Sequence, residues 1–154
     1  LAAIADIHAA IVDLRQYQPV IGVVAGSVGC FGGMSIAAGL CSYLVVTREA
    51  RLGLNGPQVI EQEAGLDEYD SRDRPFIWSL TGGEQRFNSG LADRYVADDV
   101  AQLQQTVSAL LQQGLPAQQR SRQAAHYLAR LAELDAVPQI DPATVRDLYQ
   151  GERS

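Results

Sequence analysis

Glycines gather behind a short apolar run near the start of the chain, in a pattern that could do chemistry. The apolar run covers residues 20–25, and a segment of small residues follows at 34–41. Four glycines lie between them: Gly26, Gly29, Gly32 and Gly33. A buried strand that opens through glycines into a helix leaves unpaired backbone N–H groups at the positive end of the helix dipole. Such a site can hold a phosphate, a carboxylate or the oxyanion of an enolate.

The same stretch contains a serine in a setting close to a nucleophile elbow. Residues 25–29 read AGSVG, with alanine in place of the first glycine of the G-x-S-x-G motif. Ser27 would be the nucleophile, and His126 with Asp93 or Asp98 would complete a triad in the chain order of that fold. His126 lies on an apolar helical stripe, where a histidine is more often structural or exposed, so the sequence favours this hydrolase less than a backbone site.

Two further interpretations of the glycines stay open. Glycines also permit a tight turn and close packing of a helix on a sheet, without any ligand. A dinucleotide site would use Glu49 as the partner of a ribose, but the glycine spacing differs from the usual fingerprint.

Hydrophobic periodicity predicts the elements that would position this loop. Apolar side chains recur in three- and four-residue steps at Leu1, Ile4, Ile7, Ile11 and Leu14, which predicts an amphipathic helix. Residues 20–25 and 43–47 predict two strands buried on both faces, with a small-residue helix at 33–41 between them. This strand–helix–strand order is typical of a parallel sheet.

The rest of the chain is expected to be mainly helical. A short strand and turn are expected at 51–56, and another short strand at 91–96. Helices are expected at 57–65, 84–89, 100–111, 125–134 and 144–149.

Composition limits the class of protein. The chain has 154 residues, 47% of them hydrophobic and 19% charged, which is enough for one domain with a core. A net charge of -6 argues against nucleic acid or an anionic membrane surface as the main partner. The two cysteines, Cys30 and Cys41, form neither a disulfide framework nor a metal-ligand pattern, so we expect no metal site and a reducing, cytoplasmic setting. Because the sequence opens at Leu1, directly in helical periodicity, we expect it to be a piece of a longer polypeptide.

Two longer motifs carry a family resemblance. Residues 19–46, PVIGVVAGSVGCFGGMSIAAGLCSYLVV, resemble the central segment of the crotonase superfamily, where a Gly-rich loop leads into a helix whose first amides stabilise a thioester enolate. Residues 51–62, RLGLNGPQVIEQ, resemble the carboxyltransferase β subunits of acetyl-CoA carboxylase. With residues 30–35 and 67–70, these motifs are most similar to the β subunits of biotin-independent malonate decarboxylases, over about residues 19–98.

The resemblance implies roles for particular residues. The second oxyanion amide of the superfamily falls at the middle glycine of Phe31-Gly32-Gly33, so Gly32 is the first candidate N–H donor and Gly33 the second. Hydratase members carry catalytic glutamates at the position of Ser35 and near that of Asn55, so hydration of an enoyl thioester is disfavoured. The implied substrate-binding residues are Gly29, Cys30, Phe31, Asn55 and Gly56.

The implied reaction is decarboxylation of a malonyl thioester to the acetyl thioester and CO2. The malonyl group would be carried on an acyl carrier protein through a coenzyme-A-derived arm, and this chain itself would bind no cofactor. The implied partners are a γ subunit of related fold, the acyl carrier subunit and, if it is separate, the N-terminal half of the β subunit. That half, upstream of Leu1, would supply the first oxyanion amide.

The implied fold is α/β, a fragment of the crotonase-like (ClpP/crotonase) spiral with a C-terminal helical tail. Residues 1–98 would form the C-terminal part of a carboxyltransferase domain, and residues 99–154 a helical tail that packs on the core or on a partner subunit. Two other functions stay open. One is a carboxyltransferase β subunit that uses carboxybiotin, and the other is a non-catalytic assembly subunit.

Three side chains outside the glycine loop are expected to have no role in catalysis. Glu61 lies in a predicted helix and should be solvated, although it could face the site. His8 lies near the apolar face of the first predicted helix, and Trp78 is expected in the core or at a subunit contact.

Overall fold

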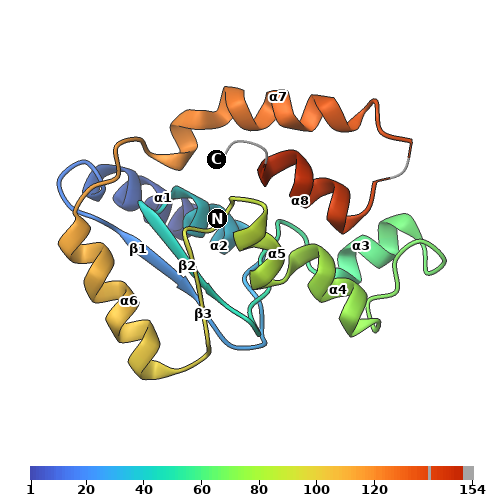
Figure 1. Ribbon diagram of the computed structural model, residues 1–154, viewed down its shortest axis with the longest axis horizontal. Coiled ribbons are helices and arrows are strands. Elements are labelled where there is room, and N and C mark those ends of the chain that lie inside the picture. Colours follow the sequence, from blue (N-terminus) through green and yellow to red (C-terminus); the bar gives the residue numbers. More distant parts are fainter. Residues whose placement is uncertain (139, 151–154) are drawn as a thin grey trace.

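The computed structural model describes residues 1–138 and 140–150, and its elements follow one another as shown in Figure 1. The strands are β1 (Ile21–Val24), β2 (Tyr43–Thr47) and β3 (Arg94–Val96). The α-helices are α1 (Ala2–Leu14), α2 (Gly33–Leu40), α3 (Pro57–Ala64), α4 (Arg74–Thr81), α5 (Gly83–Asn88), α6 (Val100–Gln113), α7 (Ala124–Leu134) and α8 (Pro142–Gln150). A 3-10 helix, η1 (Arg120–Gln123), precedes α7.

A parallel sheet forms the centre of the molecule. Within the described residues its strand order is β1-β2-β3, and both neighbouring pairs are parallel. Val45 of β2 lies opposite Val23 of β1 on one side and Arg94 of β3 on the other. All five residues of β2 are buried, as the run YLVVT predicts for a strand covered on both faces. The predicted β1–α2–β2 unit is confirmed.

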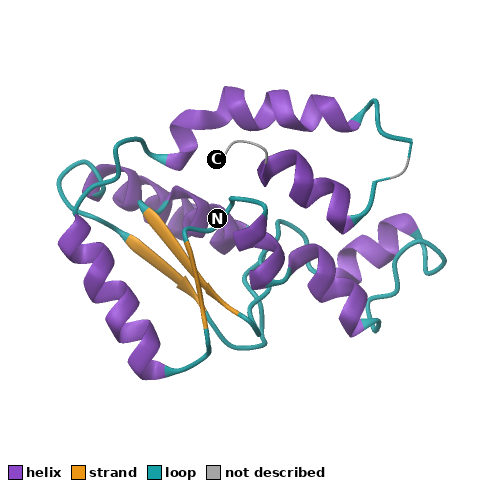
Figure 2. Ribbon diagram, viewed as in Figure 1, coloured by secondary structure: helices purple, strands orange, loops and turns teal. Residues whose placement is uncertain are grey.

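Helices cover both faces of the sheet (Figure 2). On one face Tyr43 and Val45 pack with Leu110 of α6. On the other face Leu44 and Val46 pack with Ala38 of α2. This alternation follows from the two-residue repeat of a strand, which sends successive side chains of β2 to opposite faces.

The start of α5 lies directly against the end of β2. A Cβ atom on Gly83 would lie 2.0 Å from the carbonyl oxygen of Thr47, so no larger residue fits there without a shift of the backbone. The N–H of Gly83 donates to the carbonyl of Ala50 at 2.9 Å. The Gly82-Gly83 pair therefore ends α4 and lets α5 approach the sheet closely.

Helix boundaries follow the signals in the sequence. Pro57 lies in the first turn of α3, and Gly65 caps its C-terminal end with a φ of 95°. Asp99 caps α6 by accepting a hydrogen bond from the N–H of Gln102 at 2.9 Å. The structure thus confirms both of these helices near their predicted positions.

Two strand predictions need correction. β1 lies at the edge of the sheet within the described chain, and Val23 is 44% exposed, so β1 is not buried on both faces. An apolar run shows that a strand can be covered on both faces, but not that another part of the chain lies over each face. Residues 51–56 form isolated bridges instead of a strand, from Leu52 to Cys30 and from Arg51 to Gly82.

The C-terminal helices α7 and α8 run along one side of the molecule (Figure 1). α8 contacts α5, where the side-chain amide of Gln85 donates to the carbonyl of Pro142 at 2.9 Å. Leu128 of α7 is 65% exposed. No helix in residues 1–138 and 140–150 is both long enough and apolar enough to cross a membrane.

Candidate functional site

The glycine loop after β1 is held by backbone pairing with residues 51–54. The N–H of Cys30 donates to the carbonyl of Arg51 at 2.8 Å, and the N–H of Gly53 donates to the carbonyl of Cys30 at 3.2 Å. The N–H of Gly32 donates to the carbonyl of Leu54 at 2.7 Å. This ladder, which runs parallel at Cys30 and Leu52, fixes the loop where it enters α2.

The prediction that Gly32 offers an unpaired N–H is therefore wrong. Its φ of 62° requires glycine and directs its N–H toward the Leu54 carbonyl. The sequence shows that the turn contains glycines, but it does not show that a distant segment pairs with it. Gly32 keeps a structural role as the N-cap residue of α2.

The open donors are the next two amides. Gly33 and Met34 begin α2, and within the described chain neither N–H has a hydrogen-bond partner. The N–H and the hydroxyl of Ser35 both donate to the carbonyl of Gly32, at 3.0 and 2.7 Å. Two adjacent N–H groups at a helix N-terminus can hold a negatively charged oxygen. Gly33, the second candidate from the sequence, is thus available. Met34 was not among the predicted donors, although it occupies the second position of the predicted helix.

Helix α1 fixes the position of Gly33. The Nε2 atom of His8 donates to the carbonyl of Gly33 at 2.8 Å. A Cβ atom on Gly33 would lie 2.7 Å from Cγ2 of Ile4, so α1 packs closely on this residue. His8 therefore has the structural role expected from its place in the sequence.

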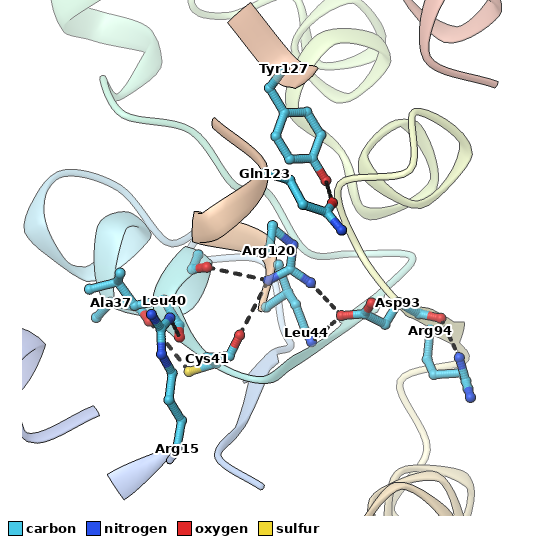
Figure 3. Close-up of polar contacts among 11 residues, drawn as sticks. Arg15, Ala37, Leu40, Cys41, Leu44, Asp93, Arg94, Arg120, Gln123 and Tyr127 are labelled. Carbon is cyan, nitrogen blue, oxygen red and sulfur yellow. Dashed lines mark hydrogen bonds and ion pairs between the residues drawn. The ribbon is translucent and has the colours of Figure 1, made fainter. Parts of the chain in front are cut away.

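Two arginines hold the opposite end of α2 (Figure 3). Arg15 donates to the carbonyl of Leu40 at 2.7 Å. Arg120 donates to the carbonyls of Gly39 and Cys41 at 3.3 and 3.4 Å, and it forms an ion pair with Asp93. Because cations and donors at a helix C-terminus satisfy its last carbonyls and its dipole, these contacts stabilise the orientation of α2.

The predicted substrate-binding residues surround this loop. Gly29 has a φ of 94°, and a Cβ atom there would lie 2.4 Å from the ring of Phe31. Gly56 caps α3, and Asn55 before it is exposed. The hydrogen bond from the N–H of Gly32 to the carbonyl of Leu54 brings residues 55–56 next to the glycine loop. Their binding roles remain predictions.

The alternative catalytic residues have other partners. Asp93 accepts from the N–H of Leu44 at 2.7 Å and from Arg120, so its carboxylate is already used in the structure. Ser27 is exposed, and its carbonyl accepts from Arg51 at 2.7 Å. Glu61 accepts from the N–H of Ser71 at 2.7 Å, and this hydrogen bond lowers the pKa of its carboxyl group. Glu61 thus fixes the loop after α3.

The thiols near α2 have little thiolate character. Burial raises the pKa of Cys30, which is half-buried in the glycine loop. Burial also raises the pKa of Cys41, whose Sγ donates to the carbonyl of Ala37 at 3.3 Å. Both cysteines are free, and a protonated thiol is a weak nucleophile.

Comparison with known proteins shows what this arrangement resembles. A chain of the Pseudomonas malonate decarboxylase hetero-tetramer, crystallised in complex with malonate, is 71% identical and superimposes with a TM-score of 0.92 over 97% of this chain. The chain is similar to a malonate decarboxylase subunit. A second structure, the Pseudomonas malonate decarboxylase hetero-dimer, matches with 66% identity and a TM-score of 0.76 over 86% of this chain.

A curated relative is also similar to this chain. The malonyl-S-ACP:biotin-protein carboxyltransferase of Malonomonas rubra is 38% identical over 112 residues, which is 73% of this chain. No protein-family model matches the chain. The chain spans 54% of each malonate decarboxylase chain and 35% of the Malonomonas relative. The malonate decarboxylase resemblance predicted from the motifs is confirmed, and the similar subunits are longer than this chain.

Proposed function

We propose that this chain is part of the β subunit of a malonate decarboxylase and holds the enolate formed from a malonyl thioester. The observation that carries the proposal is the pair of N–H groups at Gly33 and Met34, at the start of α2, that have no hydrogen-bond partner among the described residues. The similarity to malonate decarboxylase chains extends through this segment, because it covers 97% of the chain.

The chemistry requires stabilisation of charge at one oxygen. In decarboxylation the bond between the carboxylate carbon and the α carbon breaks, and its electron pair moves toward the thioester oxygen. The enolate then takes up a proton at the α carbon to give the acetyl thioester. Fixed N–H donors aimed at that oxygen lower the barrier, because they stabilise the charge as it develops.

The assembly belongs to the same proposal. We infer a crotonase-like spiral fold, with residues 1–98 in the carboxyltransferase domain and residues 99–154 as the helical tail. The substrate would be malonyl on the coenzyme-A-derived arm of an acyl carrier protein, with a γ subunit as partner and the N-terminal half of the β subunit supplying a further amide. The free thiols of Cys30 and Cys41 support a reducing compartment such as the cytoplasm.

A matched pair of variants tests the role of the Gly33 N–H. Proline suits the first position of a helix but lacks the N–H, whereas alanine keeps it. Both residues place a Cβ against Ile4, so Gly33→Ala reports the steric effect alone. In the full-length subunit assembled with its partners, we expect Gly33→Pro to lower kcat for malonyl-thioester decarboxylation about 100- to 1000-fold relative to Gly33→Ala.

The outcomes separate the possible functions. Equal turnover of the two variants, within about threefold, would contradict a catalytic role for the Gly33 N–H. An intact wild-type complex without decarboxylase activity would indicate an assembly subunit. Carboxyl transfer from carboxybiotin, without decarboxylation when biotin is absent, would indicate a carboxyltransferase instead.

A further inference from the structure

Arg51 joins the glycine loop to the rest of the fold through both its side chain and its backbone. Its Nη2 atom donates to the carbonyls of Ser27 and Val28, at 2.7 and 2.8 Å. Its own carbonyl accepts from the N–H of Cys30 at 2.8 Å. One residue therefore contacts the loop at three places, just before the open amides of α2.

Aromatic rings hold the Arg51 guanidinium in place. Its Cζ atom lies 4.5 Å from the centre of the Trp78 ring and 5.6 Å from that of Phe31. The indole N–H of Trp78 donates to the carbonyl of Glu49 at 3.2 Å, which fixes that ring. A cation stacked on rings loses side-chain freedom before it binds anything, so its hydrogen bonds define the position of the loop.

The segment that carries Arg51 is itself fixed on its other side. Leu52 donates to the carbonyl of Thr81 at 2.8 Å, and Arg51 forms an antiparallel bridge with Gly82. The loop is thereby linked through Arg51 to the junction of α4 and α5, which lies directly against the end of β2.

We propose that Arg51 is a positioning residue that sets the direction of the Gly33 and Met34 amides, an inference that rests on the proposed function. Arg51 acts through the loop and does not touch the thioester. Lysine does not replace it, because an ammonium group lacks the planar guanidinium that stacks on Trp78 while its Nη2 atom reaches both carbonyls. Oxyanion donors stabilise the transition state more than the bound substrate, so their misplacement lowers kcat more than it raises KM.

The test compares Arg51→Lys with Arg74→Lys in the full-length, assembled enzyme. Arg74 is a matched control, because its Cζ lies 5.1 Å from the centre of the same Trp78 ring. Arg74 itself is an exposed residue of α4. We expect Arg51→Lys to lower kcat about tenfold or more with KM within about threefold of wild type, and Arg74→Lys to change neither beyond about twofold. In the Arg51→Lys variant, hydrogen exchange should become at least about fivefold faster in peptides covering residues 26–34. In the Arg74→Lys variant, exchange in these peptides should stay as in the wild type.

Each result decides the inference. Unchanged exchange in residues 26–34 would overturn it, because Arg51 would then not hold the loop. Faster exchange with unchanged kcat would also overturn it, because the position of the loop would then not matter for the reaction. A higher KM with unchanged kcat would likewise overturn the inference, because it would assign Arg51 to substrate binding. If the wild-type complex does not decarboxylate malonyl thioesters, the proposed function fails, whereas the exchange measurement still shows separately whether Arg51 orders the loop.

Discussion

The ion pair between Arg120 and Asp93 should stabilise the fold by more than a surface pair would. Arg120 lies in η1 and Asp93 just before β3, so the pair joins the C-terminal segment to the sheet. Their side chains are 14% and 33% exposed. Substitution of Arg120 by alanine removes the ion pair and the contacts with the carbonyls of Gly39 and Cys41.

The expected magnitude lies between two known limits. Exposed pairs contribute about 0–1 kcal/mol, and breaking a buried pair costs about 3–5 kcal/mol. Because the Asp93 side chain retains some contact with solvent, we expect a coupling energy of about 1–3 kcal/mol. We expect Arg120→Ala alone to lower the free energy of unfolding by about 3 kcal/mol, since it also loses charged hydrogen bonds to carbonyls.

A double-mutant cycle measures this coupling. Arg120→Ala, Asp93→Asn and the double variant of the full-length subunit are compared by equilibrium unfolding in urea. The control is the same cycle on Arg72 and Asp70, whose side chains are 76% and 39% exposed and whose coupling should stay below about 1 kcal/mol. A coupling for Arg120 and Asp93 below about 0.5 kcal/mol, or equal to that of the control, would refute this reasoning.

Two further predictions follow from the close contacts and the titrating groups. Gly83→Ala should destabilise the subunit by about 3 kcal/mol or more, because the new Cβ would meet the Thr47 carbonyl. Gly39→Ala should stabilise the subunit by about 0.5–1 kcal/mol, because Gly39 lies in α2 with open space around it. Both changes in the free energy of unfolding are measured by denaturant unfolding. Because the N–H of Ser71 lowers the pKa of Glu61, the stability that Glu61 contributes is present above its unfolded pKa of about 4.3 and is lost as the pH falls through its folded pKa. The stability difference between wild type and Glu61→Gln should therefore shrink below about pH 4, and a constant difference from pH 7 to about pH 3 would contradict this cause.

Local signals predicted most of the elements. The run YLVVT predicted β2, Pro57 and Gly65 marked the ends of α3, and the three- and four-residue steps from Leu1 to Leu14 predicted α1. These features depend on neighbours within a few residues, so a sequence contains them directly. The edge position of β1, with Val23 exposed, depends on which strands lie beside it and could not be read from the same residues.

The candidate site was located from the sequence but not resolved in its detail. The glycines and the helix that follows them indicated where unpaired N–H groups would lie. The choice between Gly32 and Gly33 depended on the carbonyl of Leu54, which lies 22 positions after Gly32 in the chain. No feature of the sequence near Arg51 indicated its role, because its partners lie in the loop before α2 and in α4.

The sequence by itself determined that a strand opens through glycines into a helix, which predicted an oxyanion site at the helix start, and its motifs indicated the malonate decarboxylase resemblance. The tertiary structure decided which amides stay unpaired and which side chains hold them in place. The physical reason is that a backbone N–H is open only if no carbonyl from elsewhere in the chain reaches it, and this depends on how distant segments pack.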